Sequence, residues 1–530
     1  MYYLLPFRFH VFRDQELLTN DLGDYLLVPR GSVQRIVDRE VLSEEELYKD
    51  LVASSFISEK PLPRLIDTMA VRLATRKAFL DHFTALHIFV LTLRCNQNCI
   101  YCQASSQESC REEYNMSEQT LLHAVDLMFC SPSPSLTMEF QGGEPTLVPH
   151  LIRRAIEYAE EKNRTENREI TYVVCTNSVN LTDELLDLCK RYGAVISTSL
   201  DGPQFLHDHN RGKTDSYQRV VAGITKAREE LGEGRVSALM TTSEYSLDYP
   251  QEIIDAYRGN GFHSIFIRAL NPYGLAKDNA DWTAYYDRFI EFYKQALDYI
   301  IELNKSGEMF VEEFATLILR KILTPFPIGF VDLQSPAGII NGVVVYNYDG
   351  YVYASDESRM LAEFRDYTFR LGSVTDRYED LFYGRKAQEI SRLWATECVA
   401  GCADCAFQSI CGADPVRNYS TQGDMYGFRP TSTFCRKHRA IIEHIFGLLV
   451  GKRYYPFLKA GSREQEDNEG YDRHKFQRQC AVHHFAVQQP LPHVLSTAFI
   501  AKRSRRVFSK EHGPDRLCSA GTAVDRNHGR

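Results

Sequence analysis

Three closely spaced cysteines, Cys95, Cys99 and Cys102, constrain this chain more than any other feature of its sequence. The residues directly before them, 86–93, are mostly apolar and partly β-branched, which is typical of a buried strand. The cysteines therefore lie on the loop that leaves the carboxyl end of a strand, where α/β folds place their chemistry. A structural zinc ion takes four protein ligands, and a cubane iron–sulfur cluster has four irons to ligate. Three thiolates leave one iron open to a ligand that is not protein, which favours a reactive centre.

Between residues 85 and 270 the sequence alternates between two apolar patterns. Short runs rich in apolar and β-branched residues are typical of buried strands, and the apolar residues between them recur at helical spacing. Six such repeats with short connections predict parallel strands, right-handed crossovers and a partial or closed barrel. The strand-like runs are 86–93, 136–140, 170–175, 194–200, 236–241 and 264–269, and the helical patterns are 117–129, 151–159, 183–192, 217–231 and 250–257.

Length and composition limit the classes of protein. A chain of 530 residues predicts about three domains, and a net charge of −9 over that length indicates neither a nucleic-acid nor a membrane partner. No stretch reaches the roughly 18 apolar residues of a membrane span, and the first residues lack the pattern of a secretory signal. Fourteen cysteines without an export signal indicate a reducing compartment, the cytoplasm. There, clustered cysteines indicate metal or redox chemistry rather than disulfides.

The spacing C-x3-C-x2-C, with Tyr101 directly before the third cysteine, resembles the signature of the radical S-adenosylmethionine (SAM) enzymes. In that family SAM chelates the open iron of a [4Fe–4S] cluster, and the reduced cluster cleaves SAM to a 5′-deoxyadenosyl radical that abstracts a hydrogen atom. The resemblance places Tyr101 at the cofactor and implies a (β/α)6 partial barrel over residues 80–275. The same spacing also arises by chance near turns.

The second strand is followed by a motif of the same family. Gly142, Gly143, Glu144 and Pro145 match its GGEP motif, which implies that Glu144 binds the SAM amino group. The two glycines predict a close approach of the backbone to a ligand, with backbone N–H groups left free. On its own, such a tetrapeptide is usually a turn.

The next two strand ends carry further similar residues. Asn177 lies in Thr-Asn-Ser, which resembles the motif at the methionyl and ribose side of SAM. Ser199 and Arg211, twelve residues apart, match residues that contact SAM in peptide-modifying maturases. An arginine fork suits a bidentate grip on the SAM carboxylate. Turn capping is the simpler interpretation of Asn177 and Ser199.

Residues 1–60 form a separate unit in the sequence pattern. Residues 16–28 predict a strand, a turn and a second strand, and Ser43 predicts the start of a helix. The unit resembles the small winged peptide-binding domains that hold leader peptides in peptide-modifying systems. An N-terminal extension packed on the main domain is the alternative interpretation.

A cysteine-rich unit follows two bridging helical patterns in residues 276–330. Residues 342–353 predict a hairpin with Asp349-Gly350 at its turn, which we expect to cover the open end of the barrel. The following cysteines resemble the SPASM domain, the auxiliary-cluster module of radical SAM peptide maturases, over residues 331–455. The resemblance implies a second [4Fe–4S] cluster, and four thiolates also suit a structural zinc ion. The implied ligands are Cys402, Cys405, Cys411 and Cys435, with Cys398 as a spare.

The cysteine-rich unit also departs from the two-cluster pattern. Residues 335–338 and 354–357 contain no cysteine, and Pro415 stands where a further ligand would fall. The resemblance therefore implies at least one auxiliary cluster and supplies no ligands for another. Asp356 falls where some relatives carry a carboxylate that takes a substrate proton, and a solvated turn residue is the alternative.

The residues around the quartet, 411–416, 421–425 and 429–432, and the opening residues 5–9 look like the radical SAM maturase of the His-Xaa-Ser peptide system. This implies a small ribosomally made precursor peptide, a second radical SAM protein and an electron donor such as flavodoxin or ferredoxin. The alternative is a non-catalytic iron–sulfur or zinc protein that only binds the peptide. The composition of residues 456–530 predicts a disordered tail.

Overall fold

The computed structural model describes residues 2–61, 63–277, 281–391 and 395–450. All of these residues fall within one compact unit of the chain. The predicted tail, 456–530, lies outside the described residues. Among the residues described, no helix is both long enough and apolar enough to cross a membrane.

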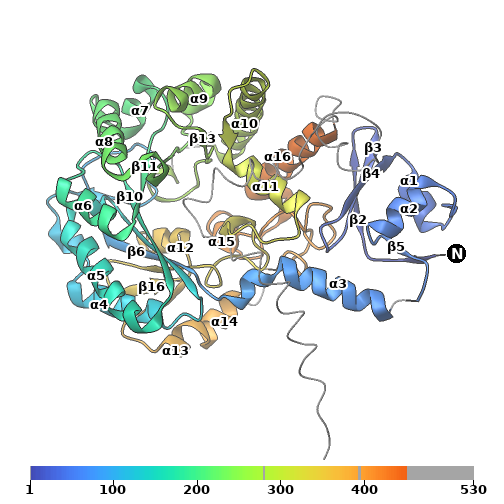
Figure 1. The fold of residues 1–530 in the computed structure, drawn as a ribbon, viewed down its shortest axis with the longest axis horizontal. Helices are drawn as coiled ribbons and strands as arrows, with labels where there is room; N and C mark the ends of the chain where they lie inside the picture. Colours follow the sequence, from blue (N-terminus) through green and yellow to red (C-terminus); the bar gives the residue numbers. More distant parts are fainter. Residues whose placement is uncertain (1, 62, 278–280, 392–394, 451–530) are drawn as a thin grey trace, which may run out of the picture. The chain divides into compact units, whose positions relative to one another are not determined.

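The largest sheet has eight strands in the order β12-β11-β10-β9-β6-β15-β16-β17. From β12 to β6 every neighbour is parallel, and helices α4, α5, α6 and α8 lie along one face (Figure 1). The α/β class and five of the six predicted strands are therefore confirmed. The strands are β6 (Leu86–Thr92), β9 (Ser135–Gly142), β10 (Glu169–Thr176), β11 (Val195–Ser199), β12 (Val236–Leu239), β15 (Val343–Tyr346), β16 (Tyr351–Tyr353) and β17 (Arg370–Ser373). The helices of this part are α4 (Glu118–Phe129), α5 (Pro149–Glu166), α6 (Asp183–Tyr192), α7 (Gln204–Arg211), α8 (Ser216–Leu231) and α9 (Pro250–Gly259).

Local capping explains where several of these helices begin and end. The side chain of Ser117 accepts a hydrogen bond from the backbone N–H of Thr120 at the start of α4. Thr182 caps α6 in the same way by accepting from Leu185. Helix α6 ends at Gly193, whose φ of 69° is the left-handed conformation that glycine adopts without strain.

The sixth predicted strand, 264–269, is much shorter than expected. One backbone N–H group within this segment and one directly after it donate to side chains instead of to a neighbouring strand. Ile267 donates to the carboxylate of Glu312, and Leu270 donates to the hydroxyl of Tyr285. The segment therefore keeps only one isolated parallel bridge to the β12 side, and the (β/α)6 prediction is corrected to five full strands. What remains is a two-stranded sheet of β13 (Ser264–Ile265) and β14 (Val311–Glu312).

The hairpin β15–β16 forms as predicted, but its place differs from our expectation. Strand β15 pairs in parallel with β6, so the hairpin continues the sheet instead of covering the open end of a barrel. A free β6 edge would expose unpaired backbone groups, and the hairpin satisfies them. Val343, Val345 and Tyr353 are buried against Ile88 and Val90 of β6, which fixes the hairpin at that edge.

The first sixty residues contain the predicted strands β3 and β4, and a neighbouring strand, β2, that the sequence pattern did not reveal. The three form an antiparallel sheet. Leu18, Ile36, Leu51 and Phe56 are buried in a small core of their own beneath it. The elements are β1 (Tyr3–Leu4), β2 (Arg8–Phe12), β3 (Gln15–Thr19), β4 (Tyr25–Pro29), α1 (Ser32–Val37), α2 (Glu46–Ala53) and β5 (Ile57–Ser58), and helix α3 (Pro63–Arg76) follows them.

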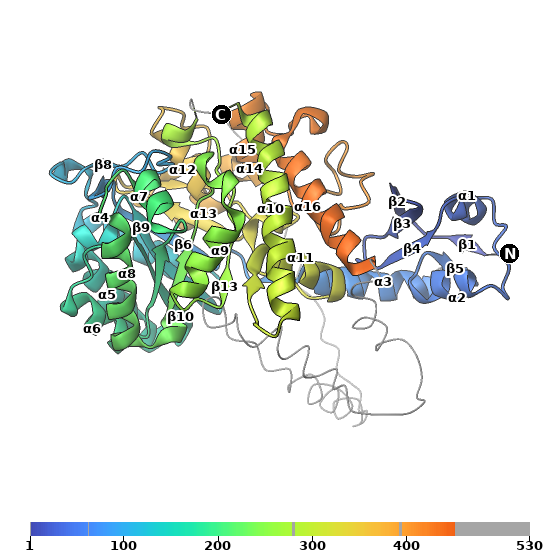
Figure 2. The ribbon, with the colours of Figure 1, turned by 90° about the horizontal axis from the view of Figure 1, so that it is seen from above.

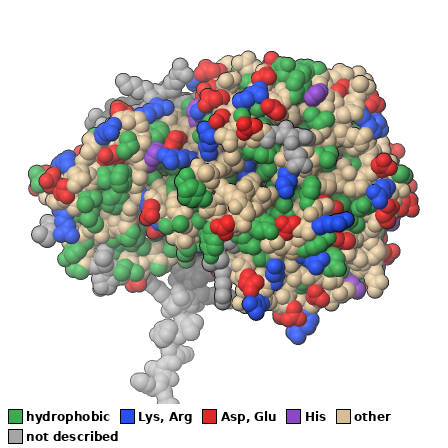
Figure 3. All heavy atoms as spheres, turned by 180° about the vertical axis from the view of Figure 1, so that it is seen from behind, with side chains coloured by type: hydrophobic (Ala, Val, Ile, Leu, Met, Phe, Trp, Pro, Cys, Tyr) green, Lys and Arg blue, Asp and Glu red, His purple; other side chains and the backbone are tan. Residues whose placement is uncertain are grey.

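The two bridging helices are confirmed, and helix α10 packs along α16 (Figure 2). Helix α12 packs against strands β15 to β17, which places its first residues beside the large sheet. The remaining elements are β7 (Arg94–Cys95), β8 (Gln107–Glu108), α10 (Trp282–Lys305), α11 (Glu313–Leu323), α12 (Asp356–Ala362), α13 (Tyr378–Phe382), α14 (Arg385–Ser391), α15 (Pro415–Gln422) and α16 (Thr433–Val450). On the face shown in Figure 3, acidic and basic side chains are interspersed.

A buried histidine links the hairpin to the predicted sheet. His87 of β6 is fully buried, and its Nε2–H donates to the carbonyl of Thr84. Its Nδ1 therefore accepts from the hydroxyl of Tyr346 on β15, at 3.0 Å. Burial lowers the pKa of His87 to about 3. In the unfolded chain a histidine binds a proton near pH 6.5, so acidification below that value favours the unfolded state.

We expect the His87→Gln variant to lose less stability on acidification than the native chain. Between about pH 6 and pH 4, the native His87 withholds a proton that the unfolded chain binds, which costs about 1.4 kcal/mol per pH unit. The unfolding free energy from urea denaturation should therefore fall less steeply with decreasing pH in the variant. His150→Gln, at an exposed position of α5, is the matched control and should keep the native slope. Equal slopes for native chain and His87→Gln would contradict the assignment.

Candidate active site

The three cysteines follow β6 on one loop and lie close to each other. The side chain of each is partly buried, and the Cys95 thiol interacts electrostatically with those of Cys99 and Cys102. Burial raises the pKa of Cys95 to about 12, with the nearby carboxyl of Glu144 adding to the effect. Such a thiol stays protonated at neutral pH unless a bound cation stabilises the thiolate. The donor set therefore fits a metal centre.

Gly142 and Gly143 serve the cysteine loop in a different way from the one we expected. Their segment does not leave its N–H groups free, because Gly143 donates to the carbonyl of Thr92 and Glu144 to that of Arg94, both at 2.7 Å. A Cβ atom at Gly142 would lie 2.0 Å from the oxygen of Thr92, and one at Gly143 would lie 2.3 Å from that of Arg94. The glycines allow the end of β9 to press against the backbone that leads into the cysteines.

The carboxylate of Glu144 is buried and joins two strand ends. Its Oε1 accepts from the hydroxyl of Thr176 at 2.6 Å and from that of Thr146 at 2.7 Å, and its Oε2 accepts from the backbone of Asn177 at 2.8 Å. Burial raises the pKa of Glu144, and these hydrogen bonds oppose the rise. Glu144 therefore fixes the loop after β10 relative to the GGEP segment.

Asn177 and Ser199 occupy the next two strand ends. Asn177 is buried, and its side-chain amide donates to the side chain of Asn96 in the cysteine loop at 2.7 Å. Its side-chain oxygen also accepts from the backbone of Val179, which is the capping role that we weighed for it. Ser199 is the last residue of β11 and is partly buried. Asn177 thus contacts the cysteine loop directly.

The guanidinium of Arg211 is already held by the chain itself. It donates from Nε and Nη2 to both oxygens of Asp201, at 2.9 and 2.8 Å. We expected this guanidinium to be free for a bidentate contact with the SAM carboxylate, whereas two of its nitrogens are bonded to Asp201. The hydroxyl of Tyr101 donates to the same carboxylate at 2.6 Å, and Nη1 of Arg211 points to the sulfur of Cys99 at 3.8 Å. Burial alone raises the pKa of Asp201, but the charge and hydrogen bonds of Arg211 outweigh it and the pKa is lowered. Asp201 was missed in the sequence, although it lies two residues after Ser199.

The opposite face of the sheet from the helices carries polar groups. On β9, Met138 and Phe140 are buried in the main core, so Glu139 between them points to the other face. Glu139 is hydrogen-bonded to Cys175 of β10, and burial raises the pKa of both. Asp356 interacts electrostatically with both side chains, which places the start of α12 over this face. A charged residue within an apolar strand was the sequence signal for Glu139.

Beside Asp356, a group of polar side chains has few partners. Asp356 pairs with Arg359 at 3.2 Å, whereas Glu357 makes no hydrogen bond to any residue that the structure describes. Burial and the nearby carboxylates raise the pKa of Glu357 to about 8. Tyr273 is 2% exposed, its hydroxyl lacks a partner among the described residues, and it interacts electrostatically with Asp414 and Glu357.

Tyr273 is also tied to the cysteine loop through its neighbour in sequence. A Cβ atom at Gly274, whose φ is 59°, would lie 2.3 Å from the carbonyl oxygen of Cys102. Leu275 donates its backbone N–H to that same oxygen at 2.9 Å. The Tyr273 hydroxyl, which has no partner among the described residues, thus belongs to a loop that packs on the end of the cysteine segment.

The second set of cysteines also comes together. The thiol of Cys411 interacts electrostatically with those of Cys402, Cys405 and Cys435, and burial raises its pKa to about 12. Cys398 is exposed. No group of three or more His, Cys, Asp or Glu side chains among the described residues is arranged around a single metal ion. In a cubane cluster each thiolate bonds a different iron, so such ligands are spaced more widely than around one ion.

Comparison with known proteins identifies the domain around the first cysteines. Residues 89–257 match the family model of the radical SAM superfamily. The chain carries a radical SAM domain. The chain is 20% identical over 364 residues to the cysteine-type anaerobic sulfatase-maturating enzyme of Clostridium perfringens. The matched region covers 67% of this chain and 94% of that enzyme. The chain is also 25% identical over 349 residues to an uncharacterized protein of Archaeoglobus fulgidus. That match covers 65% of this chain and 78% of the other protein.

A solved structure shares the fold of the radical SAM domain and its surroundings. The structure of native anSMEcpe with bound AdoMet superposes with a TM-score of 0.56 at 19% identity, over 69% of this chain and 98% of that chain. The radical SAM family implies a [4Fe–4S] cluster and SAM. The gathered thiols of Cys95, Cys99 and Cys102 and the glycine contact behind them fit such a cluster.

We expect the Asp201→Asn variant to be less stable by about 3–5 kcal/mol and to bind SAM weakly after cluster reconstitution. The change leaves the buried guanidinium of Arg211 without its counter-charge and frees Tyr101 beside Cys99. Thermal unfolding and calorimetric titration with SAM measure the two effects. Asp183→Asn is the control, because that exposed carboxylate also pairs with a basic residue. A variant with native stability would show that the Asp201–Arg211 pair does not hold the site.

Proposed function

We propose that this chain is a radical SAM enzyme that modifies a small ribosomally made peptide with His-Xaa-Ser repeats. The observation that carries the proposal is the gathering of Cys95, Cys99 and Cys102 on one loop inside a radical SAM domain. The similarity to a sulfatase-maturating enzyme supports a protein or peptide substrate. One solved structure of anSMEcpe holds AdoMet together with a Kp18Cys peptide, which also supports this substrate class.

We propose a separate role for the three cysteines and for the residues around SAM. Cys95, Cys99 and Cys102 would hold three irons of the cluster, and the bound cluster with SAM supplies the 5′-deoxyadenosyl radical that removes a hydrogen atom from the peptide. Glu144 and Asn177 orient the loops at the predicted amino and methionyl side of SAM. Further contacts to SAM are proposed for Tyr101, Gly142, Gly143, Ser199 and Arg211.

The Asp201 contact changes how Arg211 is proposed to act. Two of its donors remain on Asp201, which leaves Nη1, the nitrogen closest to Cys99, to meet a carboxylate. A guanidinium that is fixed before SAM arrives loses little rotamer freedom when SAM binds. We therefore propose that Asp201 orients Arg211 for a single-sided contact with the SAM carboxylate.

The other parts of the chain complete the proposal. Residues 1–60 bind the leader of the precursor peptide, residues 80–275 form the radical SAM core, and residues 331–455 hold an auxiliary [4Fe–4S] cluster, with residues 276–330 between the last two. The auxiliary ligands are Cys402, Cys405, Cys411 and Cys435, while the exposure of Cys398 leaves it outside the set. The enzyme works in the cytoplasm with an electron donor such as flavodoxin or ferredoxin and with a second radical SAM protein.

We expect alanine at Cys95, Cys99 or Cys102 to abolish cleavage of SAM. Two thiolates are too few to keep a cubane cluster with an open iron in place. The measurement is release of 5′-deoxyadenosine from anaerobically reconstituted protein that has been reduced with dithionite and given SAM. Cys130→Ala is the control, since that exposed cysteine lies at the end of α4 and touches none of the three. Formation of 5′-deoxyadenosine by any of the three alanine variants would contradict the proposed cluster site.

Asp356 is the proposed acceptor of the proton that the substrate loses after hydrogen abstraction. It lies near Glu139 and Cys175, on the face of the large sheet that is opposite helices α4, α5, α6 and α8. We expect Asp356→Asn to cleave SAM at the native rate while modified peptide falls at least about a hundredfold, because general-base catalysis contributes at least that much. Mass spectrometry of a co-produced His-Xaa-Ser precursor measures the modification.

Two further variants test which carboxylate takes the proton. Asp380→Asn, at an exposed position of α13, should behave as the native chain. If Glu357→Gln stops the modification and Asp356→Asn does not, the base is Glu357. Because burial and nearby carboxylates raise the pKa of Glu357 to about 8, the rate would then rise with pH through that value.

A further inference from the structure

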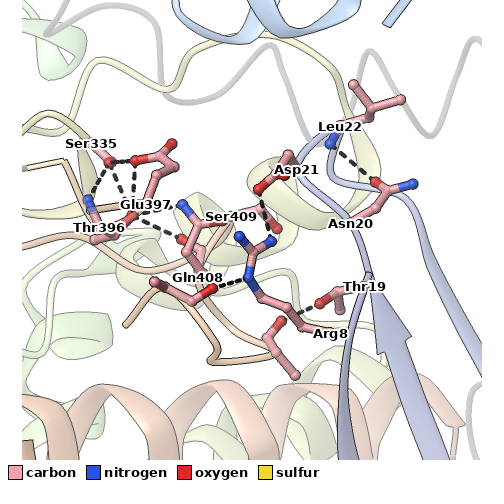
Figure 4. Close-up of polar contacts among 12 residues, drawn as sticks. Arg8, Thr19, Asn20, Asp21, Leu22, Ser335, Thr396, Glu397, Gln408 and Ser409 are labelled. Atoms are coloured by element: carbon pink, nitrogen blue, oxygen red, sulfur yellow. Dashed lines mark hydrogen bonds and ion pairs between the residues drawn. The ribbon is translucent and has the colours of Figure 1, made fainter. Parts of the chain in front are cut away.

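Two side chains of the N-terminal sheet reach the loop that carries the second set of cysteines (Figure 4). Arg8 donates from Nε to the carbonyl of Ala403, and Thr19 donates its hydroxyl to the carbonyl of Ala406 at 2.6 Å. Ala403 directly follows Cys402, and Ala406 directly follows Cys405. Each bond therefore holds the carbonyl of the residue that directly follows one of the gathered cysteines.

The two donors stand on a rigid support. Arg8 of β2 and Thr19 of β3 are direct cross-strand partners in the antiparallel sheet. Thr19 is buried, and a second nitrogen of Arg8 pairs with Asp21 at 2.7 Å, which orients its guanidinium. The sheet thus presents two fixed donors that face one short loop.

Apolar and charged contacts surround these two hydrogen bonds. The ring of His10 lies 5.3 Å from that of Phe407, and His10 also contacts the carboxylate of Glu443 on α16 at 2.9 Å. Phe12 and Leu17 are buried in the same core as Phe407. The N-terminal sheet therefore covers one side of the segment between Cys405 and Cys411.

A separate polar network joins Thr396 and Glu397, which lead into this loop, to Gln408 within the loop. Thr396 donates its backbone N–H to the hydroxyl of Ser335 at 2.8 Å and accepts from the side-chain amide of Gln408 at the same distance. Ser335 donates to Glu397 (Figure 4). Glu397 also pairs with Lys77 at 2.6 Å. This network joins residues of the cysteine-rich part to Lys77, which directly follows α3, and it contains neither Arg8 nor Thr19.

Between residues 398 and 414 the described chain forms turns without a helix or strand. The backbone hydrogen bonds within the loop join residues at most four apart in sequence, so contacts from outside the loop fix these turns relative to the rest of the chain. Groups that orient ligands commonly change metal affinity by about 10–100-fold. We propose that Arg8 and Thr19 are positioning residues of the auxiliary metal centre, so that the N-terminal sheet forms one wall of that centre. This rests on the proposed metal site at Cys402, Cys405, Cys411 and Cys435.

The proposal makes the N-terminal unit and the metal centre thermodynamically coupled. A loop that is held by metal presents its two carbonyls to Arg8 and Thr19, and the two donors in turn keep the thiols in place for the metal. By reciprocity, a change that moves β2 and β3 from the loop weakens metal binding, and metal loss loosens the N-terminal unit by the same free energy.

The test uses the full chain with Cys95, Cys99 and Cys102 replaced by alanine, so that all bound metal is at the second set. Iron and zinc are counted per chain after anaerobic purification, and their release to a chelator is followed with time. We expect Arg8→Gln and Thr19→Val to release metal at least about tenfold faster than this parent chain. The electron paramagnetic resonance signal of the reduced cluster should also change in both variants.

Two controls separate positioning from general destabilisation. Arg35→Gln removes an arginine of the same unit whose partner, Glu45, lies within the unit, so metal release should stay at the parent rate. Thr19→Ser keeps the hydroxyl and should restore slow release. The proposal would be overturned if both Arg8→Gln and Thr19→Val released metal at the rate of the parent chain. It would also be overturned if Arg35→Gln accelerated metal release as much as they do. A parent chain that holds neither iron nor zinc would overturn the metal site as well, whereas SAM cleavage by the native chain would stay as proposed.

Discussion

The close contact between the end of β9 and the cysteine loop is the constraint on which the rest of the site depends. Gly142 and Gly143 bring two backbones together at a distance that no side chain permits, and two backbone hydrogen bonds close the contact. Strand β6 leads into the cysteine loop and the end of β9 packs against it, so these two strands together place the three thiols. The next strands are then tied to the same place by the buried carboxylate of Glu144.

A buried ion pair extends this arrangement to the fourth strand. Asp201 and Arg211 are both almost fully buried, so each would be costly without the other, by about 3–5 kcal/mol. Their fork geometry also holds Tyr101 and faces Cys99. The polar groups near the cysteines thus position one another before any cofactor binds, which lowers the free-energy cost of ordering them on binding.

The sequence predicted what local patterns encode. Apolar periodicity located five parallel strands and their helices, and the spacing of Cys95, Cys99 and Cys102 located the loop that matters. The sequence did not reveal that the backbone N–H groups of Ile267 and Leu270 donate to side chains, which shortens the sixth strand. Their partners, Glu312 and Tyr285, lie in later elements of the chain. The position of the hairpin beside β6 was missed for the same reason, since pairing of a strand edge depends on tertiary packing.

The two sets of cysteines illustrate this difference between local and distant information. The first set is followed by further motifs within the same run of strands, so sequence patterns predicted much of its surroundings, although Asp201 was missed. The second set is recognisable from spacing too, but the loop that carries it accepts hydrogen bonds from Arg8 and Thr19, almost four hundred residues earlier in the chain. Single-sequence patterns cannot link a carbonyl in a turn to a donor on a remote strand. The candidate ligands of both sets are thus found from local spacing, whereas the contacts around the second set depend on the whole fold.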